Sequence, residues 1–227
     1  MNTLLLALGL LTATPATATD VTDAVEALQP RRTRAGTLRF VDSVLADPAA
    51  PAALLARLGQ DDAPARRLAV ADALARSIAT TGVSPAGLTD AAVHDADPLV
   101  RARLLVALDP ARDLTALLER LASDPSSPVR AAAASALSEN TSARHALVLA
   151  ARDQAPEVRL AAVRALGWQG AEFDAVAACL GDEDRDVRLH AIQALVRIDA
   201  ARAAVAVASL VDDPDASVRH MVSRLTR

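Results

Sequence analysis

The sequence contains no lysine and no tyrosine, and its only aromatic residues are Phe40, Trp168 and Phe173. Without lysine, Schiff-base catalysis and the lysine-containing phosphate-binding loop are excluded. A single cysteine, Cys179, excludes a disulfide-stabilised scaffold. The glycine-rich dinucleotide motif and the serine-hydrolase elbow are also absent. The remaining composition, dominated by Ala, Leu, Arg, Val and Asp over 227 residues, favours packed helices.

The charge balance is slightly acidic, with a net charge of −4, and all 24 basic residues are arginine. This balance gives no overall attraction to nucleic acid or anionic lipid, so we expect no nucleic-acid partner. The only dense basic cluster comprises Arg31, Arg32, Arg34 and Arg39. It indicates a solvated linker, with an anion site or a membrane-surface contact as the alternative.

Residues 1–18 have the pattern of a signal peptide. An apolar run from Leu4 to Leu11 precedes Ala16-Thr17-Ala18, which matches the small-x-small site of signal peptidase. We predict cleavage after Ala18, a periplasmic or secreted protein, and no stable membrane anchor once the signal is removed. The alternative is a cytoplasmic protein with an apolar N-terminal helix, because Met1 alone supplies positive charge before the run.

A motif of about 30 residues repeats along most of the chain. A Val-Arg pair recurs five times with the arginines 29 to 31 residues apart, and an aspartate stands six residues before each arginine. These Asp/Arg pairs are Asp95/Arg101, Asp124/Arg130, Asp153/Arg159, Asp182/Arg188 and Asp213/Arg219. An earlier copy lies at Asp61 and Arg67, with Arg66 in place of valine. Such self-similarity is the signature of a repeat architecture.

Each repeat predicts a pair of helices. In one copy, Val158, Ala162, Ala165 and Leu166 fall on one stripe of a helix. A second apolar helix is expected after each Val-Arg helix, at residues 114–121, 143–151, 172–180 and 201–210. A helix pair of this size cannot bury its apolar face alone, so neighbouring pairs must stack into a solenoid.

The pattern D-x-x-x-x-V-R-x-x-A-x-x-A-L resembles HEAT repeats, particularly the short bacterial kind related to phycobilisome-lyase-type repeats. The resemblance implies an all-α fold, a right-handed α-solenoid of stacked antiparallel helix pairs. It implies that the five Asp/Arg pairs form a ladder of side-chain contacts between adjacent repeats. It also implies that the first helices lie outside and the second helices line a concave surface.

The domain organisation that follows has three parts. Residues 1–18 are the expected signal peptide, and residues 19–34 form an N-terminal helix and the Arg-rich linker. Residues 35–227 form the solenoid, with a divergent first repeat at 35–60 and clear repeats at 61–227.

No catalytic, metal-binding or cofactor site is expected. The four histidines lack metal-ligand spacing, and the carboxylate pairs fall at turns, where aspartate caps helices. Cys179 lies on an apolar stretch and is expected to be buried and inert. Trp168 follows the first helix of its repeat, so it either fills the gap between helices or serves as a binding residue.

These features predict a non-catalytic scaffold that binds a protein or peptide on the concave face. The candidate contacts, taken from the second helices, are Glu119, Arg144, His145, Glu172 and Arg202. The resemblance alone suggests an alternative, a phycobilin-lyase-like protein that attaches a chromophore. A DNA-binding HEAT solenoid is less favoured, because it needs a basic groove and the net charge here is negative.

Overall fold

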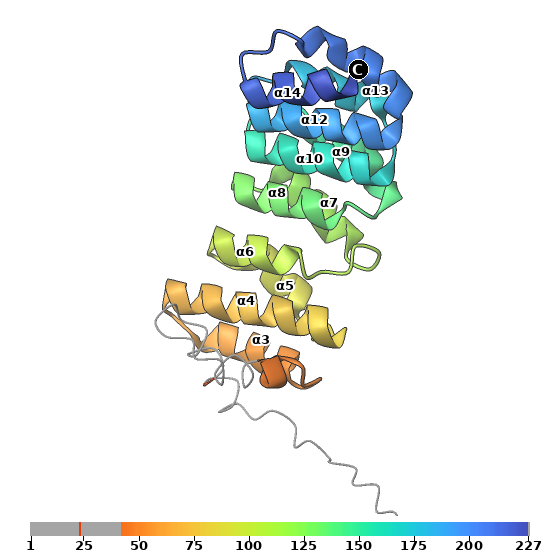
Figure 1. Cartoon of the computed structure of the whole chain (residues 1–227). Coiled ribbons are helices and arrows are strands. Elements are labelled where there is room, and N and C mark those ends of the chain that lie inside the picture. The colour runs from red at the N-terminus through yellow and green to blue at the C-terminus, as the bar shows by residue number, and fades with distance from the viewer. Residues whose placement is uncertain (1–22, 24–41, 227) are drawn as a thin grey trace, which may run out of the picture.

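The computed structural model describes residue 23 and residues 42–226. The expected signal peptide and the arginine cluster at residues 31–39 lie outside these residues. Within the described part every regular element is a helix, and the helices stack in antiparallel pairs along one curved row (Figure 1). The all-α solenoid predicted from the repeats is confirmed. No helix in this part is long and apolar enough to cross a membrane.

Two rows of helices make up the solenoid. The helices that carry the Val-Arg motif, or Arg66-Arg67 in the first of them, form what we call the Val-Arg row. Its members are α4 (Pro64–Thr81), α6 (Pro98–Leu105), α8 (Ser127–Ala136), α10 (Pro156–Gln169), α12 (Arg185–Ile198) and α14 (Ala216–Leu225). The second row consists of α3 (Ala50–Gln60), α5 (Leu88–His94), α7 (Leu114–Ser123), α9 (Arg144–Ala150), α11 (Phe173–Ala178) and α13 (Ala200–Ala206). Short 3₁₀ turns, Thr141–Ala143, Cys179–Gly181 and Val207–Leu210, flank three second-row helices.

Proline and aspartate determine where the Val-Arg helices begin. Proline stands in the first turn of α4, α6, α8 and α10, where its missing N–H costs no hydrogen bond. Asp97, Asp184 and Asp215 cap α6, α12 and α14 by accepting hydrogen bonds from backbone N–H groups of the first turn. The motif therefore defines both the hydrophobic stripe and its starting point.

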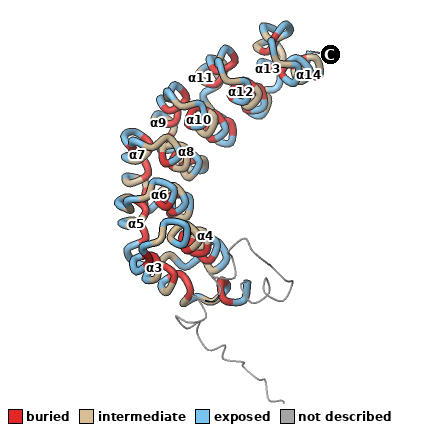
Figure 2. The backbone as a smooth tube through the Cα atoms, turned by 90° about the vertical axis from the view of Figure 1, so that its left-hand side faces the viewer, coloured by how far each residue is buried: buried red, intermediate tan, exposed pale blue. Residues whose placement is uncertain are grey.

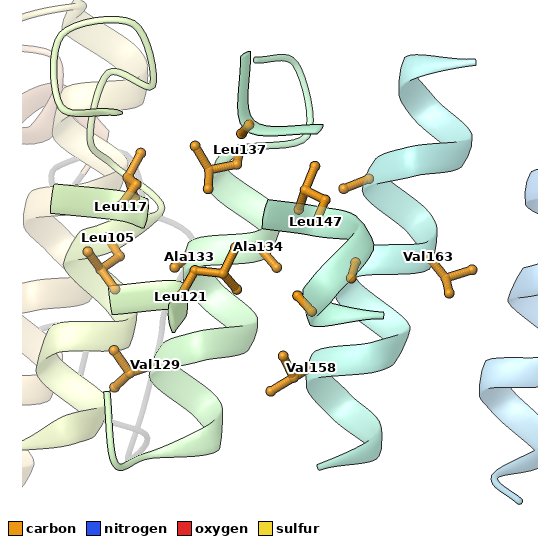
Figure 3. Close-up of a cluster of buried hydrophobic side chains, with 14 of the residues drawn as sticks. Leu105, Leu117, Leu121, Val129, Ala133, Ala134, Leu137, Leu147, Val158 and Val163 are labelled. Atoms are coloured by element: carbon orange, nitrogen blue, oxygen red, sulfur yellow. The ribbon is translucent and has the colours of Figure 1, made fainter. Parts of the chain in front are cut away.

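One hydrophobic core runs between the two rows (Figure 3). Leu105, Val129 and Val158 from the Val-Arg row meet Leu117 and Leu147 from the second row, and all five side chains are fully buried. Because each helix contributes to the interfaces on both of its sides, neighbouring repeats share this core.

The Val-Arg row lies on the concave side of the solenoid, and the second row lies on the convex side (Figure 2). From α4 to α12, consecutive Val-Arg helices pack against one another more closely than neighbouring second-row helices do. Helices α10 and α12 approach closely, since a Cβ placed on Gly167 would lie 2.5 Å from Ala194 Cβ. Small residues at these contacts shorten the Val-Arg row, so the stack bends toward it. The expectation that the second helices line the concave surface was therefore wrong.

The Asp–Arg ladder and the concave surface as candidate functional sites

Each rung of the ladder is one arginine that joins two consecutive repeats. In a representative rung, Arg130 Nε and Nη2 donate hydrogen bonds to Asp153 Oδ2 and Oδ1, both at 2.8 Å. Arg130 Nη1 donates to the backbone carbonyl of Asp124 at 2.9 Å. The arginine thus contacts the backbone carbonyl of its own turn and the carboxylate of the next repeat. Forked contacts of this kind are strong and geometrically selective.

The same arrangement recurs along the stack. Bidentate contacts also join Arg101 to Asp124, Arg159 to Asp182, and Arg188 to Asp213. Arg67 contacts the Asp95 carboxylate through Nη2. Within a repeat, each ladder arginine donates a hydrogen bond to the backbone carbonyl of the aspartate six residues before it. The carboxylate of that aspartate binds the ladder arginine of the preceding repeat.

Two ladder residues end the series among the described residues. Arg219 Nη1 donates to the Asp213 carbonyl at 2.6 Å, and the described part of the chain supplies no carboxylate to its guanidinium. At the other end, Asp61 accepts a hydrogen bond from Arg66 Nε at 3.0 Å and lies 3.3 Å from Arg57 Nη2.

The arginines lower the pKa values of four ladder carboxyls, those of Asp124, Asp153, Asp182 and Asp213. The pKa of Asp153 lies below its ordinary value chiefly because Arg130 donates hydrogen bonds to the carboxylate. Burial alone would raise the pKa values of Asp124, Asp182 and Asp213, but arginine and backbone N–H donors outweigh burial, and these values are lowered. The ladder is therefore charged at neutral pH and stabilises the stack of repeats.

The candidate contacts predicted from the second helices lie in the second row, on the convex side (Figure 2). Glu119 and His145 are exposed, and Glu172 precedes α11 in a left-handed conformation with φ of 61°. Arg202 pairs with Asp174 at 3.0 Å and lies 3.9 Å over the Phe173 ring. Arg144 and His145 are adjacent in α9, and the other three candidates belong to different parts of the second row. None of the five lines a described hollow.

Three hollows open between consecutive helices of the Val-Arg row, and a further hollow of about 260 Å³ lies between α9 and α11 of the second row. The hollow between α4 and α6 has a volume of about 590 Å³, the one between α10 and α12 about 230 Å³, and the one between α12 and α14 about 720 Å³. None of the residues that line these three hollows of the Val-Arg row belongs to a second-row helix. In the first hollow, Arg103 pairs with Asp72.

Trp168 is the large aromatic residue of this concave surface. It is 59% exposed, and the Arg197 guanidinium lies 4.7 Å from the centre of its ring. Trp168 therefore fills no gap between the two rows, and the binding alternative agrees better with its position. The concave residues Arg164, Arg197 and Arg224 were missed as candidates because the second helices were expected on that side. A signal was present, since Arg164 and Arg224 stand six residues after the motif valine of their repeats.

The described residues contain no group of three or more potential ligands that could hold a metal ion. Cys179 is buried, and burial, its largest influence, raises the pKa of the thiol to about 11. The thiol is thus protonated at neutral pH.

Comparisons with known proteins agree with this architecture. A HEAT-repeat family model matches residues 114–139, and a second model for HEAT repeats matches residues 143–225. A search of the curated proteins gives no significant match. The X-ray structure of YibA from Escherichia coli is similar, with a TM-score of 0.56 and 17% sequence identity over 93% of this chain and 83% of that chain. At this identity the likeness shows a shared fold.

Proposed function

This chain is a HEAT-repeat protein, and from that premise we propose that it binds a protein or peptide along its concave surface and catalyses no reaction. Stacked helical repeats form extended concave surfaces that are widely used for protein interaction. The helical scaffold fits this use, because the ladder and the shared core hold its helices in a fixed order.

The three hollows of the Val-Arg row carry the proposal. They are open to the concave side, and large apolar side chains lie beside them, with Trp168 59% exposed and Val106 47% exposed. Exposed tryptophan and arginine next to a hollow are typical of residues that dominate binding energy at protein interfaces. The ladder arginines, by contrast, are already occupied within the scaffold.

Site-specific photo-crosslinking in the native host tests the concave assignment. A photoreactive residue at Gln193 or Val106 on the concave side is compared with one at Leu149 or Val205, which are exposed on the second row. We expect defined protein adducts from the concave positions and none from the convex ones. Adducts confined to the convex positions, or their absence at all four, would refute the proposal.

We also propose that the protein acts outside the cytoplasm, on the basis of the apolar run and the small-x-small site in residues 1–18. Cell fractionation followed by intact-mass measurement tests this proposal. A chain beginning at Thr19 in the periplasm or medium supports export, and an uncleaved cytoplasmic chain refutes it.

A further inference from the structure

The two hollows on either side of α12 adjoin one another. Gln193 lines both the hollow between α10 and α12 and the hollow between α12 and α14. Together they form a depression across three consecutive Val-Arg helices, which we call the C-terminal groove. Its polar part includes Arg164, Trp168 and Arg197, and its apolar part lies between α12 and α14.

The C-terminal groove is basic although the whole chain is acidic. Three arginines line it, namely Arg164, Arg197 and Arg224, and His190 and His220 add two imidazoles. Among the residues that the structure describes, no aspartate or glutamate lines either hollow. None of the three arginines has an ion-pair partner among the described residues, whereas every bidentate ladder arginine binds a carboxylate.

The groove arginines and the ladder arginines differ in what they can offer a binding partner. A guanidinium engaged by a carboxylate within the scaffold offers little to a partner, while an unpaired one retains its full charge and its forked donors. The cation–π contact with Trp168 also holds Arg197 in place at the groove surface. The groove therefore presents ordered positive charge to an anionic partner.

The part of the groove between α12 and α14 is apolar and large. Leu189, Ile192 and Val196 of α12 face Met221 and Leu225 of α14 around a hollow of about 720 Å³. A volume in this range accommodates bulky side chains, and methionine adapts to different shapes. Aliphatic walls favour an aliphatic or aromatic side chain over a nucleobase, which needs aromatic stacking platforms.

We propose that the C-terminal groove binds an acidic segment of a partner protein that carries a large apolar side chain. The apolar side chain occupies the hollow between α12 and α14, and neighbouring carboxylates contact Arg164, Arg197 and Arg224. This inference rests on the proposed function and names the chemistry of the partner. Charge complementarity carries it, because three arginines that pair with no carboxylate of the described residues flank an apolar hollow.

The chain provides its own reporter for this site. Trp168 is the only tryptophan and lies at the groove, so its fluorescence responds to occupancy there. The probe is a short peptide without tryptophan, in which glutamates flank two adjacent leucines. A peptide with glutamine for glutamate tests the charge, one with alanine for leucine tests the apolar contact, and an oligothymidylate tests binding of single-stranded nucleic acid.

We expect the full chain to bind the glutamate–leucine peptide with a change in Trp168 emission. The double variant Arg164→Glu with Arg224→Glu should weaken binding by more than about tenfold, because it replaces attraction by repulsion. Arg144→Glu with Arg202→Glu makes the same change in net charge and should alter binding by less than about twofold, since both residues belong to the second row and neither lines the groove. Circular dichroism of each variant confirms that the helices remain folded.

Several outcomes would overturn the proposal. The first is that the glutamate–leucine peptide does not bind, or that its glutamine or alanine version binds equally well. The second is that both double variants lose the same amount of peptide affinity. The third is that the oligothymidylate binds more tightly than the glutamate–leucine peptide. If the peptide fails but concave crosslinks to a protein persist, the proposed function stands and only this partner chemistry is refuted. If concave crosslinks are absent as well, both are refuted.

Discussion

Asp182→Ala would remove the carboxylate of one complete rung and leave the Arg159 guanidinium without its main counterion. Arg159 Nε and Nη2 each donate to the Asp182 carboxylate at 2.7 Å, and both side chains are 9% exposed. Removal of one partner from a buried ion pair costs about 3–5 kcal/mol. Arg159 would keep its hydrogen bonds to the carbonyls of Asp153 and Gln154. We therefore expect the lower end, a loss of about 3 kcal/mol in the free energy of unfolding.

Urea denaturation followed by far-UV circular dichroism measures this loss. With a denaturant slope near 3 kcal/mol per molar, the midpoint should fall by about 1 M. The matched control is Asp174→Ala, which breaks the exposed pair with Arg202, where the side chains are 56% and 92% exposed. Exposed pairs contribute little, so we expect almost no change in the control midpoint. A loss for Asp182→Ala no greater than for Asp174→Ala would refute the stabilising role of the ladder.

The same rung predicts a dependence on pH. The pKa of Asp182 is lowered in the folded protein, so its contribution to stability is fully present above the unfolded-state pKa of about 3.9. That contribution is lost as the pH falls through the folded-state pKa. The difference in unfolding free energy between wild type and Asp182→Ala should therefore be constant near neutral pH and shrink below about pH 4. An undiminished difference in that acid range would contradict the assignment.

Three further perturbations follow from the packing. Gly167→Ala places a Cβ 2.5 Å from Ala194 Cβ of α12, so it should destabilise the protein by about 1–3 kcal/mol. Thermal unfolding measures this loss, and an unchanged midpoint would contradict the close approach of the two helices. Leu147→Ala empties a fully buried site and should cost about 2–5 kcal/mol in urea unfolding, while the exposed Leu149→Ala serves as its control and should cost little. Cys179, with its thiol pKa raised to about 11, should resist a thiol reagent at neutral pH until urea unfolds the chain; rapid labelling of the folded protein would oppose this view.

The sequence alone determined the architecture of the repeats. The Val-Arg column supplies the buried valines, the prolines and aspartates define the helix starts, and the spacing of about 30 residues requires two helices for each unit. These are local properties, because helical periodicity and capping act within a few residues of one another. The second helices were expected within a few residues of where the structure places them.

The tertiary structure decided which row of helices lies on the concave side (Figure 2). The direction of bending depends on how closely helices approach, as at Gly167 and Ala194, and this distance is a property of pairs of helices rather than of one helix. The sequence also presented Arg130 and Arg164 as similar arginines on the Val-Arg helices of two consecutive repeats, α8 and α10. Only the stacking of repeats brings the Asp153 carboxylate to Arg130 and leaves Arg164 unpaired beside a hollow. Charge pairing across repeats is a non-local contact, and the orientation of the stack determines it.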